Sequence, residues 1–395
     1  MVKVPRFLDN FKHEEDLMAT DKVIGINGLG RMGKLILWQL IARGQQTVVV
    51  NVGREIGEKP SDLLEYLLYD STFGSLKENL GGRFSMDDID IQVDGFGRLY
   101  QIRGTRIFVL KKERNPKNIP WVEFDVKVVL EATGKFNYPE RRSDQLEGSA
   151  RGHFDSLSVE KVFITSPFKL SEGIPGDSIM MVNGVNDYLY DPKMHRIISN
   201  ASCSTTCLAH LVNPWVKFLG AKKIKVISAD IPHAKTNKEP SLDRLPLAGK
   251  GDPCTWRSSN ENMFISSTGS AKALPIVIPE LAETEFSAKS IREPSDTVSL
   301  VIATLVIDEA HHFTQEKIGE IYQKYGGNFV SWSLERNFSK KFLGSNQATI
   351  VDGLNCESIP FGNNYQLVKI YGWFDNEWGY VSMFMKNLET ILASI

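Results

Sequence analysis

The sequence predicts an α/β protein in which a Rossmann-type, doubly wound parallel sheet is followed by a second, α+β catalytic domain. The first observation is an apolar stretch, KVIGIN, that runs into GLGRMG, then into an amphipathic helical stretch and a second apolar stretch, TVVVN. A G-x-G-x-x-G motif between a strand and a helix is typical of a dinucleotide-binding βαβ unit. The second observation is that the apolar stretches after Cys203 become longer and lose the regular helices between them, which is typical of an α+β domain.

These patterns divide the chain into four segments. We expect an N-terminal extension at 1–21, a dinucleotide-binding domain at 22–202, a catalytic domain at 203–378, and a C-terminal helix at 379–395 that returns to the first domain. The extension mixes acidic and basic residues, and we expect a short helix in it around Phe7, Leu8 and Phe11.

Apolar and β-branched runs predict the individual elements. In the first domain we expect strands of one mostly parallel sheet at 22–27, 47–51, 106–110, 125–133 and 161–167, and a helix at 34–44. In the second domain we expect a helix at 204–219 and strands at 224–231, 299–307 and 365–374. Residues 238–262 are rich in Pro, Gly, Ser and charged residues and predict a long surface loop.

Composition excludes several classes of function. The formal net charge is −2 and the basic residues are scattered, so a nucleic-acid partner is not expected. We expect no membrane segment, because no apolar stretch reaches the length that spans a bilayer. The four cysteines, at 203, 207, 254 and 356, do not resemble a secreted disulfide framework, which favours a cytoplasmic location.

Cys203 is the strongest single candidate for catalysis. It lies in SNASCSTTCLAH, where an apolar run gives way to small hydroxyl residues and then to a helical stretch. At a helix N-terminus, free backbone N–H groups and the helix dipole favour a thiolate and a neighbouring anion. The sequence therefore indicates a nucleophile with an acidic thiol, and a small buried cysteine that only packs is the alternative.

A series of motifs resembles one family, the phosphorylating glyceraldehyde-3-phosphate dehydrogenases. From residue 22 to the C-terminus they are INGLGRMGK, LLYDSTFG, RNPKNIPW, VVLEATGKF, VFITSP, NGVND, SNASCSTTCLA, HAKT, SSTGSAKA, IPEL and GWFDNEWGY. The chain is identified as a divergent member, with a leader and extra residues around 140–158. The resemblance implies a cytoplasmic, homotetrameric enzyme of glycolysis. Such an enzyme uses NAD or NADP and inorganic phosphate to convert glyceraldehyde 3-phosphate, its small-molecule substrate, into 1,3-bisphosphoglycerate.

The resemblance also implies roles in catalysis. Cys203 would form a thiohemiacetal and then a thioester, and His233 of HAKT would keep the thiol ionised and act as the base, a task that suits a histidine pKa near neutrality. A purely structural histidine is the alternative. The substrate phosphate would be bound by Thr236 and Arg292, and the attacking phosphate by Ser202, Ser204, Thr268 and Gly269. Hydroxyls, backbone N–H groups and guanidinium groups are common partners of oxyanions.

Cofactor contacts are implied in both domains. The glycines of GLGRMG allow the tight turn and the close approach of the backbone to a pyrophosphate, although an ordinary glycine-rich turn is the alternative. The full set is Gly28, Gly30, Arg31, Met32, Gly33, Arg54, Thr133, Gly134, Thr165, Asn376 and Tyr380. Within it, Arg31 is expected near the pyrophosphate and Asn376 on the nicotinamide carboxamide.

One departure from the family concerns the choice between NAD and NADP. Val52 occupies the position of the family's ribose-binding aspartate, and Arg54 follows it closely. Loss of a carboxylate removes the repulsion of a 2′-phosphate, with which an arginine could pair. We therefore expect NADP to be tolerated or preferred, and Glu55 is the candidate ribose ligand if NAD is preferred instead.

Other departures concern the surroundings of the site. Thr206, His210 and Phe73 replace an asparagine, a proline and a histidine of the family. The arginine-rich run of the family is replaced by CTWRSSNEN, in which Arg257 is the only candidate to supply the missing charge. These changes leave open a dehydrogenase of another phosphorylated aldehyde, such as erythrose 4-phosphate, or a weakly active paralogue that serves as a binding module.

A metal site is a further alternative. Cys203, Cys207 and His210 fall at i, i+4 and i+7 of a predicted helix, and His233 could be a fourth ligand of zinc. The pair of histidines in EAHH, residues 309–312, is expected at a solvated helix start rather than in a metal site.

Overall fold

The computed structural model describes residues 20–53, 56–57, 59–81, 89–93, 97–111, 113–236, 239–245 and 253–395. The leader helix expected around Phe7 lies outside these residues. The chain forms two compact units. The first contains the described residues from Thr20 to Asn183, together with Asp187–Ala201 and Phe384–Ile395, and the second contains Gly184–Asn186 and Ser202–Met383. In the described part of the chain, no helix has the length and apolar character needed to cross a membrane.

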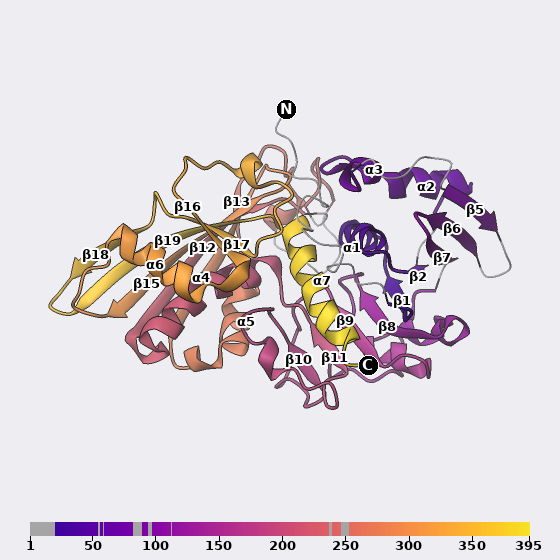
Figure 1. Ribbon diagram of the computed structural model, residues 1–395, viewed down its shortest axis with the longest axis horizontal. Helices are drawn as coiled ribbons and strands as arrows, with labels where there is room; N and C mark the ends of the chain where they lie inside the picture. The colour runs from indigo at the N-terminus through magenta and orange to yellow at the C-terminus, as the bar shows by residue number, and fades with distance from the viewer. Residues whose placement is uncertain are drawn as a thin grey trace. The chain divides into compact units, whose positions relative to one another are not determined.

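The first unit is built on a mostly parallel sheet, as the sequence predicted (Figure 1). Its strands, in spatial order, are β10 (Ser178–Met180), β11 (Ile197–Ser199), β9 (Lys161–Ile164), β8 (Val126–Glu131), β1 (Val23–Asn27), β2 (Thr47–Val52), β7 (Thr105–Lys111), β6 (Arg98–Ile102) and β5 (Ile89–Val93). Strands β10 to β7 pair in parallel. The antiparallel edge made by β5 and β6 was not predicted.

The helices and a small hairpin of the first unit complete it. They are α1 (Arg31–Ala42), α2 (Pro60–Leu68), β3 (Tyr69–Asp70), β4 (Gly74–Ser75) and α3 (Leu76–Asn79). The last helix, α7 (Trp378–Leu392), belongs to this unit from Phe384 onward. There, the ring of Phe384 stacks on that of Phe163 with 3.9 Å between the centroids, and Asn387 Nδ2 donates to Asn200 Oδ1 at 2.6 Å.

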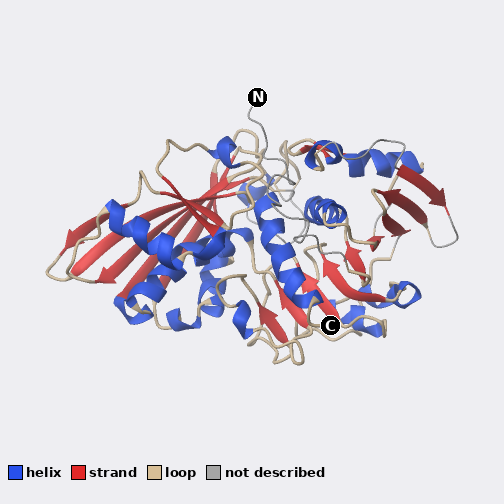
Figure 2. Ribbon diagram, in the orientation of Figure 1, coloured by secondary structure: helices blue, strands red, loops and turns tan. Residues whose placement is uncertain are grey.

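The second unit contains a mixed sheet. Its strands, in spatial order, are β13 (Phe264–Ser267), β14 (Glu285–Glu293), β12 (Ile224–Ala234), β15 (Ser299–Asp308), β19 (Tyr365–Phe374), β17 (Thr349–Asp352) and β16 (Val330–Ser333), and β18 (Glu357–Phe361) also pairs with β19. The helices are α4 (Cys203–Leu219), α5 (Ser270–Val277) and α6 (Gln315–Tyr325), drawn in blue beside this sheet in Figure 2. The three long strands that the sequence predicted, β12, β15 and β19, pair antiparallel. The expectation that no crossover helix lies between the strands of this domain is wrong for β12 and β14, which pair in parallel and have α5 between them along the chain.

The packing of α4 on this sheet depends on a close approach between the helix and strand β19. Buried and half-buried residues alternate along β15, so one face of the sheet is covered. Val301 of that face is the register partner of Gly372. A Cβ at Gly372 would lie 2.8 Å from Leu211 Cδ1 of α4 and 2.5 Å from Thr349 Oγ1. A larger residue at 372 would therefore push α4, and with it the residues at its start, away from the sheet.

Candidate active site

Cys203 is the first residue of α4, as the sequence indicated. The chain enters the helix through Ala201, whose φ of +52° lies in the left-handed region, a strained conformation for a residue with a Cβ. Ser202 caps the helix, because its Oγ accepts a hydrogen bond from Thr205 N at 3.2 Å. The thiol therefore lies beside the N–H groups of the first helical turn, and Cys203 keeps partial exposure to solvent.

The register of two strands places a histidine between this thiol and an arginine. His233 on β12 is the register partner of Arg292 on the parallel neighbour β14. His233 Nε2 lies 3.5 Å from Cys203 Sγ, and Arg292 Nη1 lies 2.8 Å from His233 Nδ1. The rings of His233 and Phe374 are nearly perpendicular, with 6.1 Å between their centroids. The structure thus brings together the predicted nucleophile and the predicted base.

His233 Nδ1 has one neighbour that is a hydrogen-bond donor and one that is an acceptor. Arg292 can only donate to this nitrogen, whereas the carbonyl oxygen of Ala234, 2.6 Å away, can only accept from it. A proton on Nδ1 leaves a lone pair on Nε2 that can take the Cys203 proton. A proton on Nε2 instead stabilises a thiolate. The arrangement can therefore serve either protonation state of the sulfur.

The electrostatics of the pair differ from the sequence-based expectation. Burial raises the pKa of the Cys203 thiol, and the Ser204 hydrogen bond and the charge of Arg292 lower it by less. Burial and then the charge of Arg292 lower the pKa of His233 to about 4. These shifts run against the expectations of an acidic thiol and of a histidine pKa near neutrality, because burial disfavours the charged form of each side chain. The directions of both shifts favour the uncharged forms of the two side chains.

The predicted ligands of the substrate phosphate converge on a carboxylate. Glu239 Oε2 accepts hydrogen bonds from Thr236 N and Thr236 Oγ1, both at 2.7 Å. Glu239 Oε1 lies 3.6 Å from Arg292 Nε. The structure brings Thr236 and Arg292 together around this anion, which the sequence analysis missed because nothing in the motif HAKT points to the loop residue that follows it.

The predicted ligands of the attacking phosphate lie at the starts of two helices. Ser202 and Ser204 are at the start of α4, and Thr268 and Gly269 directly precede α5. Hydroxyl groups connect the two starts. Thr205 Oγ1 lies 2.8 Å from Ser202 Oγ and donates to Ser270 Oγ at 3.2 Å, and Thr268 Oγ1 donates to the same Ser270 Oγ at 3.2 Å. Helix N-termini favour anions.

Asn376 and Tyr380 lie in the same unit as the nucleophile. Asn376 Oδ1 accepts from Ser299 Oγ at 3.2 Å and from Thr297 Oγ1 at 3.4 Å, which fixes the orientation of the amide. Tyr380 is buried and lines a small hollow together with Cys203 and Thr206. The family departure at Thr206 is therefore located next to the nucleophile.

A cavity of about 510 Å³ in the first unit suits a dinucleotide. Gly28, Gly30 and Thr133 line it. A Cβ at Gly28 would lie 2.9 Å from Thr133 Cγ2, and one at Gly33 would lie 2.0 Å from the Gly28 oxygen. The glycines thus keep open a cradle in front of α1, whose N-cap is Gly30 and has no side-chain cap. Such a helix start favours a pyrophosphate, so the residues present fit the expected cofactor.

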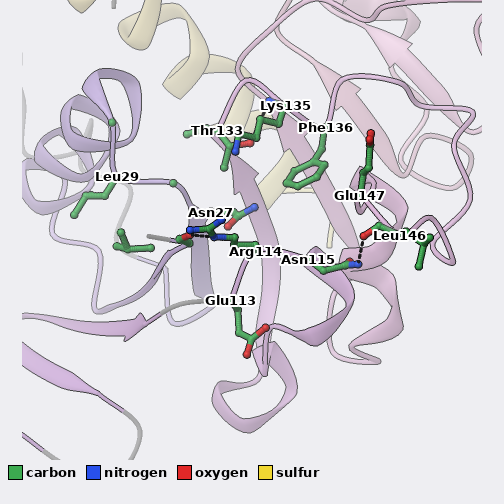
Figure 3. A pocket seen from close by; sticks show the side chains of 15 residues that line it. Asn27, Leu29, Glu113, Arg114, Asn115, Thr133, Lys135, Phe136, Leu146 and Glu147 are labelled. Carbon is green, nitrogen blue, oxygen red and sulfur yellow. Dashed lines mark hydrogen bonds between the residues drawn. The ribbon is translucent and has the colours of Figure 1, made fainter. Parts of the chain in front are cut away.

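Figure 3 shows this cavity with Asn27 and Arg114 between Leu29 on one side and Phe136 and Glu147 on the other. Some predicted cofactor residues do not line it, namely Arg31, Met32, Gly33, Gly134 and Thr165. Arg31 forms an ion pair with Asp70 and lies over the ring of Phe73, 5.7 Å from its centroid.

The cavity wall depends on a buried polar network that the sequence analysis missed. Glu131 is inaccessible to solvent and its carboxylate accepts from Asn27 Nδ2 at 2.6 Å and from Thr133 N at 2.8 Å. Trp121 Nε1 donates to His153 Nδ1 at 3.0 Å. His153 must therefore carry its proton on Nε2, which lies 3.1 Å from Glu131 Oε2 and donates to it. The network fixes the positions of Asn27 and Thr133, two residues that line the cavity. In the sequence, its only sign is the presence of polar residues in buried segments.

The end of β2 bears on the choice of cofactor. Val52 and Gly53 line the cavity, and Arg114 Nε donates to the Gly53 oxygen at 3.0 Å. Arg54 and Glu55, the residues expected to decide between NADP and NAD, lie outside the described residues. Arg114 is a cation at this end of the cavity that the sequence did not point to.

The positions of Cys207 and His210 do not support the zinc alternative. Cys207 Sγ is directed at Thr349 Oγ1, 3.2 Å away, and His210 Nδ1 lies 2.8 Å from the Thr206 oxygen. Across the described ranges, no three His, Cys, Asp or Glu side chains are grouped so as to hold a metal ion. EAHH precedes α6, which starts at Gln315 with Thr314 as its cap, so the expectation of a helix start at 309–312 is wrong.

The long loop has little regular structure where it is described, as predicted. Arg257 Nη1 donates to Asp243 Oδ2 at 2.7 Å, and both side chains are largely exposed. Arg257 is therefore engaged within the loop.

Comparisons with known proteins agree with this geometry. Residues 22–139 match the family described as "Glyceraldehyde 3-phosphate dehydrogenase, NAD binding domain", and residues 202–376 match its "C-terminal domain" counterpart. Curated relatives named "Glyceraldehyde-3-phosphate dehydrogenase 2" include one from Bacillus subtilis (strain 168), 30% identical over 90% of this chain and 93% of its own. Another, from Staphylococcus epidermidis, is 33% identical over 92% of this chain and 93% of its own.

A relative of the same name from Staphylococcus aureus (strain Mu50) is 30% identical over 94% of this chain and 96% of its own. The matches span both units and include the segments that carry Cys203 and His233. The chain therefore belongs to the glyceraldehyde 3-phosphate dehydrogenase family, and it is an NAD(P)-dependent phosphorylating oxidoreductase.

Proposed function

We propose that this protein oxidises glyceraldehyde 3-phosphate to 1,3-bisphosphoglycerate, with inorganic phosphate and NAD or NADP as co-reactants. The observation that carries the proposal is the 3.5 Å contact between Cys203 Sγ and His233 Nε2 at the start of α4. A nucleophile and a base within reach of each other are the minimum requirement for covalent catalysis.

The reaction follows from what each group can do. Cys203 Sγ adds to the aldehyde carbon while its proton passes to the carbonyl oxygen, and a thiohemiacetal forms. His233 Nε2 then takes the hydroxyl proton as the carbon is oxidised to a thioester. Bound NAD(P) supplies the hydride acceptor for this step. Finally, an oxygen of inorganic phosphate attacks the thioester carbon, the C–S bond breaks, and the proton on His233 returns to the sulfur.

Two anions have to be held during this sequence. Thr236 and Arg292 serve the phosphate of the substrate, and the hydroxyl-lined starts of α4 and α5 serve the attacking phosphate. The convergence of Thr236 and Arg292 on the Glu239 carboxylate supports the first assignment, since donors that hold one anion suit another. Asn376, whose amide is held by Ser299 and Thr297, is assigned to the nicotinamide carboxamide.

The presence of Val52 at the position of the family's ribose-binding aspartate supports the use of NADP. Val52 is buried and lines the cavity, and it cannot accept hydrogen bonds from ribose hydroxyls. Arg114 at the same end of the cavity supplies a positive charge for a 2′-phosphate.

A spectrophotometric assay tests the reaction. With glyceraldehyde 3-phosphate and NAD or NADP, we expect reduction of the cofactor that depends on inorganic phosphate or arsenate. The Cys203→Ser variant should lose at least about a thousandfold in kcat/KM, because no covalent intermediate can form. Erythrose 4-phosphate is the comparison substrate. Oxidation that is independent of phosphate, or faster with erythrose 4-phosphate, would overturn the proposal.

The pH dependence of kcat/KM tests the state of His233. Because its pKa in the free protein is lowered to about 4, the imidazole is neutral and able to accept a proton at every pH above that value. We expect kcat/KM to fall on the acid side with a midpoint near pH 4 rather than near 6.5, the ordinary pKa of histidine. An acid midpoint near 6.5 with glyceraldehyde, which has no phosphate group to titrate, would show that His233 is not held as described.

A Val52→Asp substitution tests the cofactor preference. The added carboxylate would accept the ribose hydroxyls of NAD and repel the 2′-phosphate of NADP, so the ratio of kcat/KM for NADP over NAD should fall by about tenfold or more. Val52→Ala, which adds no charge, should leave the ratio close to that of the wild type. A wild-type protein that already prefers NAD strongly would contradict the expectation.

A further inference from the structure

The Glu239 carboxylate is a buried charge whose partners are the donors that the proposed function gives to the substrate. Its side chain is 6% exposed and that of Arg292 is 20% exposed. Buried charges have to be compensated by partners. Arg292 provides the opposite charge at 3.6 Å, and Thr236 provides two hydrogen bonds at 2.7 Å. In turn, Glu239 is the counter-charge of Arg292.

These partners cannot serve a carboxylate and a phosphate ester at the same time. A dianionic phosphate on Thr236 Oγ1 and Arg292 would lie within a few ångströms of the Glu239 oxygens. At such distances, with little water between them, like charges repel strongly. One of the two anions has to leave.

The loop anchors the backbone next to Glu239. Glu239 N donates to the Thr236 oxygen at 3.1 Å, and Ser259 N donates to the Pro240 oxygen at 2.8 Å. Further along, Arg244 N donates to the Trp256 oxygen at 2.9 Å. Rotation of the Glu239 side chain is therefore the smallest movement that frees the donors.

We propose that Glu239 is a resident anion that occupies the substrate-phosphate position and is displaced by the phosphate group of the substrate. This inference rests on the proposed function, since it takes Thr236 and Arg292 as ligands of that phosphate. Glu239 sets the specificity of the site, because only a group with more negative charge than a carboxylate, such as a phosphate ester, competes well for Arg292. Its presence weakens the binding of every phosphorylated aldehyde.

Equilibrium binding of glycerol 3-phosphate, measured by calorimetry, tests the proposal without any turnover. Glu239→Gln removes the charge and keeps the shape, so we expect at least about tenfold tighter binding than to the wild type. Glu261→Gln, a matched change at an exposed residue of the same loop, should bind as the wild type does. Glu239→Asp, which retains the charge, should stay within about threefold of the wild type. Adding Thr236→Ala to Glu239→Gln should remove the gain.

Binding to Glu239→Gln that is unchanged or weaker, in a variant that melts as the wild type does, would overturn the proposal. If Glu239→Gln unfolds at a lower temperature than the wild type, the affinity for inorganic sulfate is measured in Glu239→Asp and in the wild type instead. The proposal then requires equal affinities, and unequal affinities would overturn it.

Kinetics separate this inference from the proposed function. In Glu239→Gln, KM for glyceraldehyde 3-phosphate should fall about tenfold, while KM for glyceraldehyde, which has no phosphate, should not change. If the wild type does not oxidise glyceraldehyde 3-phosphate but the variant binds glycerol 3-phosphate more tightly, the proposed function is wrong and the inference stands. If the wild type oxidises it and neither KM nor binding responds to the charge, the inference is wrong and the proposed function stands.

Discussion

The chemistry proposed for this protein depends on the register between β12 and β14, which holds the imidazole of His233 between a thiol and a guanidinium. His233 pairs with Arg292 across the two strands, and the start of α4 brings Cys203 to the other side of the ring. A slip of one residue in β12 would turn His233 to the opposite face of the sheet and leave the thiol without a base. The seat of α4, made close by Gly372, is the matching requirement on the cysteine.

Arg292 connects the base to the anion site. It lies against His233 Nδ1 on one side and near the Glu239 carboxylate on the other. Its charge lowers the pKa of His233, while that of Glu239 opposes this effect. Whatever anion occupies the site beside Thr236 therefore also acts on the base. In the proposed reaction, the binding of a phosphate group by Thr236 and Arg292 would therefore act directly on the base beside Cys203.

The sequence predicted the parts of the fold and of the site that short segments determine. The βαβ start, the parallel strands and the position of Cys203 at a helix start follow from local patterns, and the structure has them. The proximity of His233 to Cys203 came from the family resemblance, since spacing alone does not reveal it.

What the sequence did not predict depends on tertiary packing. The directions of the pKa shifts of Cys203 and His233 are set by burial, which no local motif encodes. The Glu131 network joins residues 22 and 104 positions apart. Glu239 and Arg292 are far apart in the sequence and meet only in the folded chain, whereas Arg257, the cation that the sequence offered, forms an ion pair with Asp243.

The central claim is that Cys203, with His233 as its base, carries the acyl group between oxidation and phosphorolysis. Intact-protein mass spectrometry of the wild type, mixed with glyceraldehyde 3-phosphate and NAD or NADP in buffer free of phosphate, tests it most directly. We expect one phosphoglyceroyl adduct, mapped to Cys203 by peptide analysis, that disappears when inorganic phosphate is added. Reduction of the cofactor without an adduct, or an adduct on another residue, would contradict it.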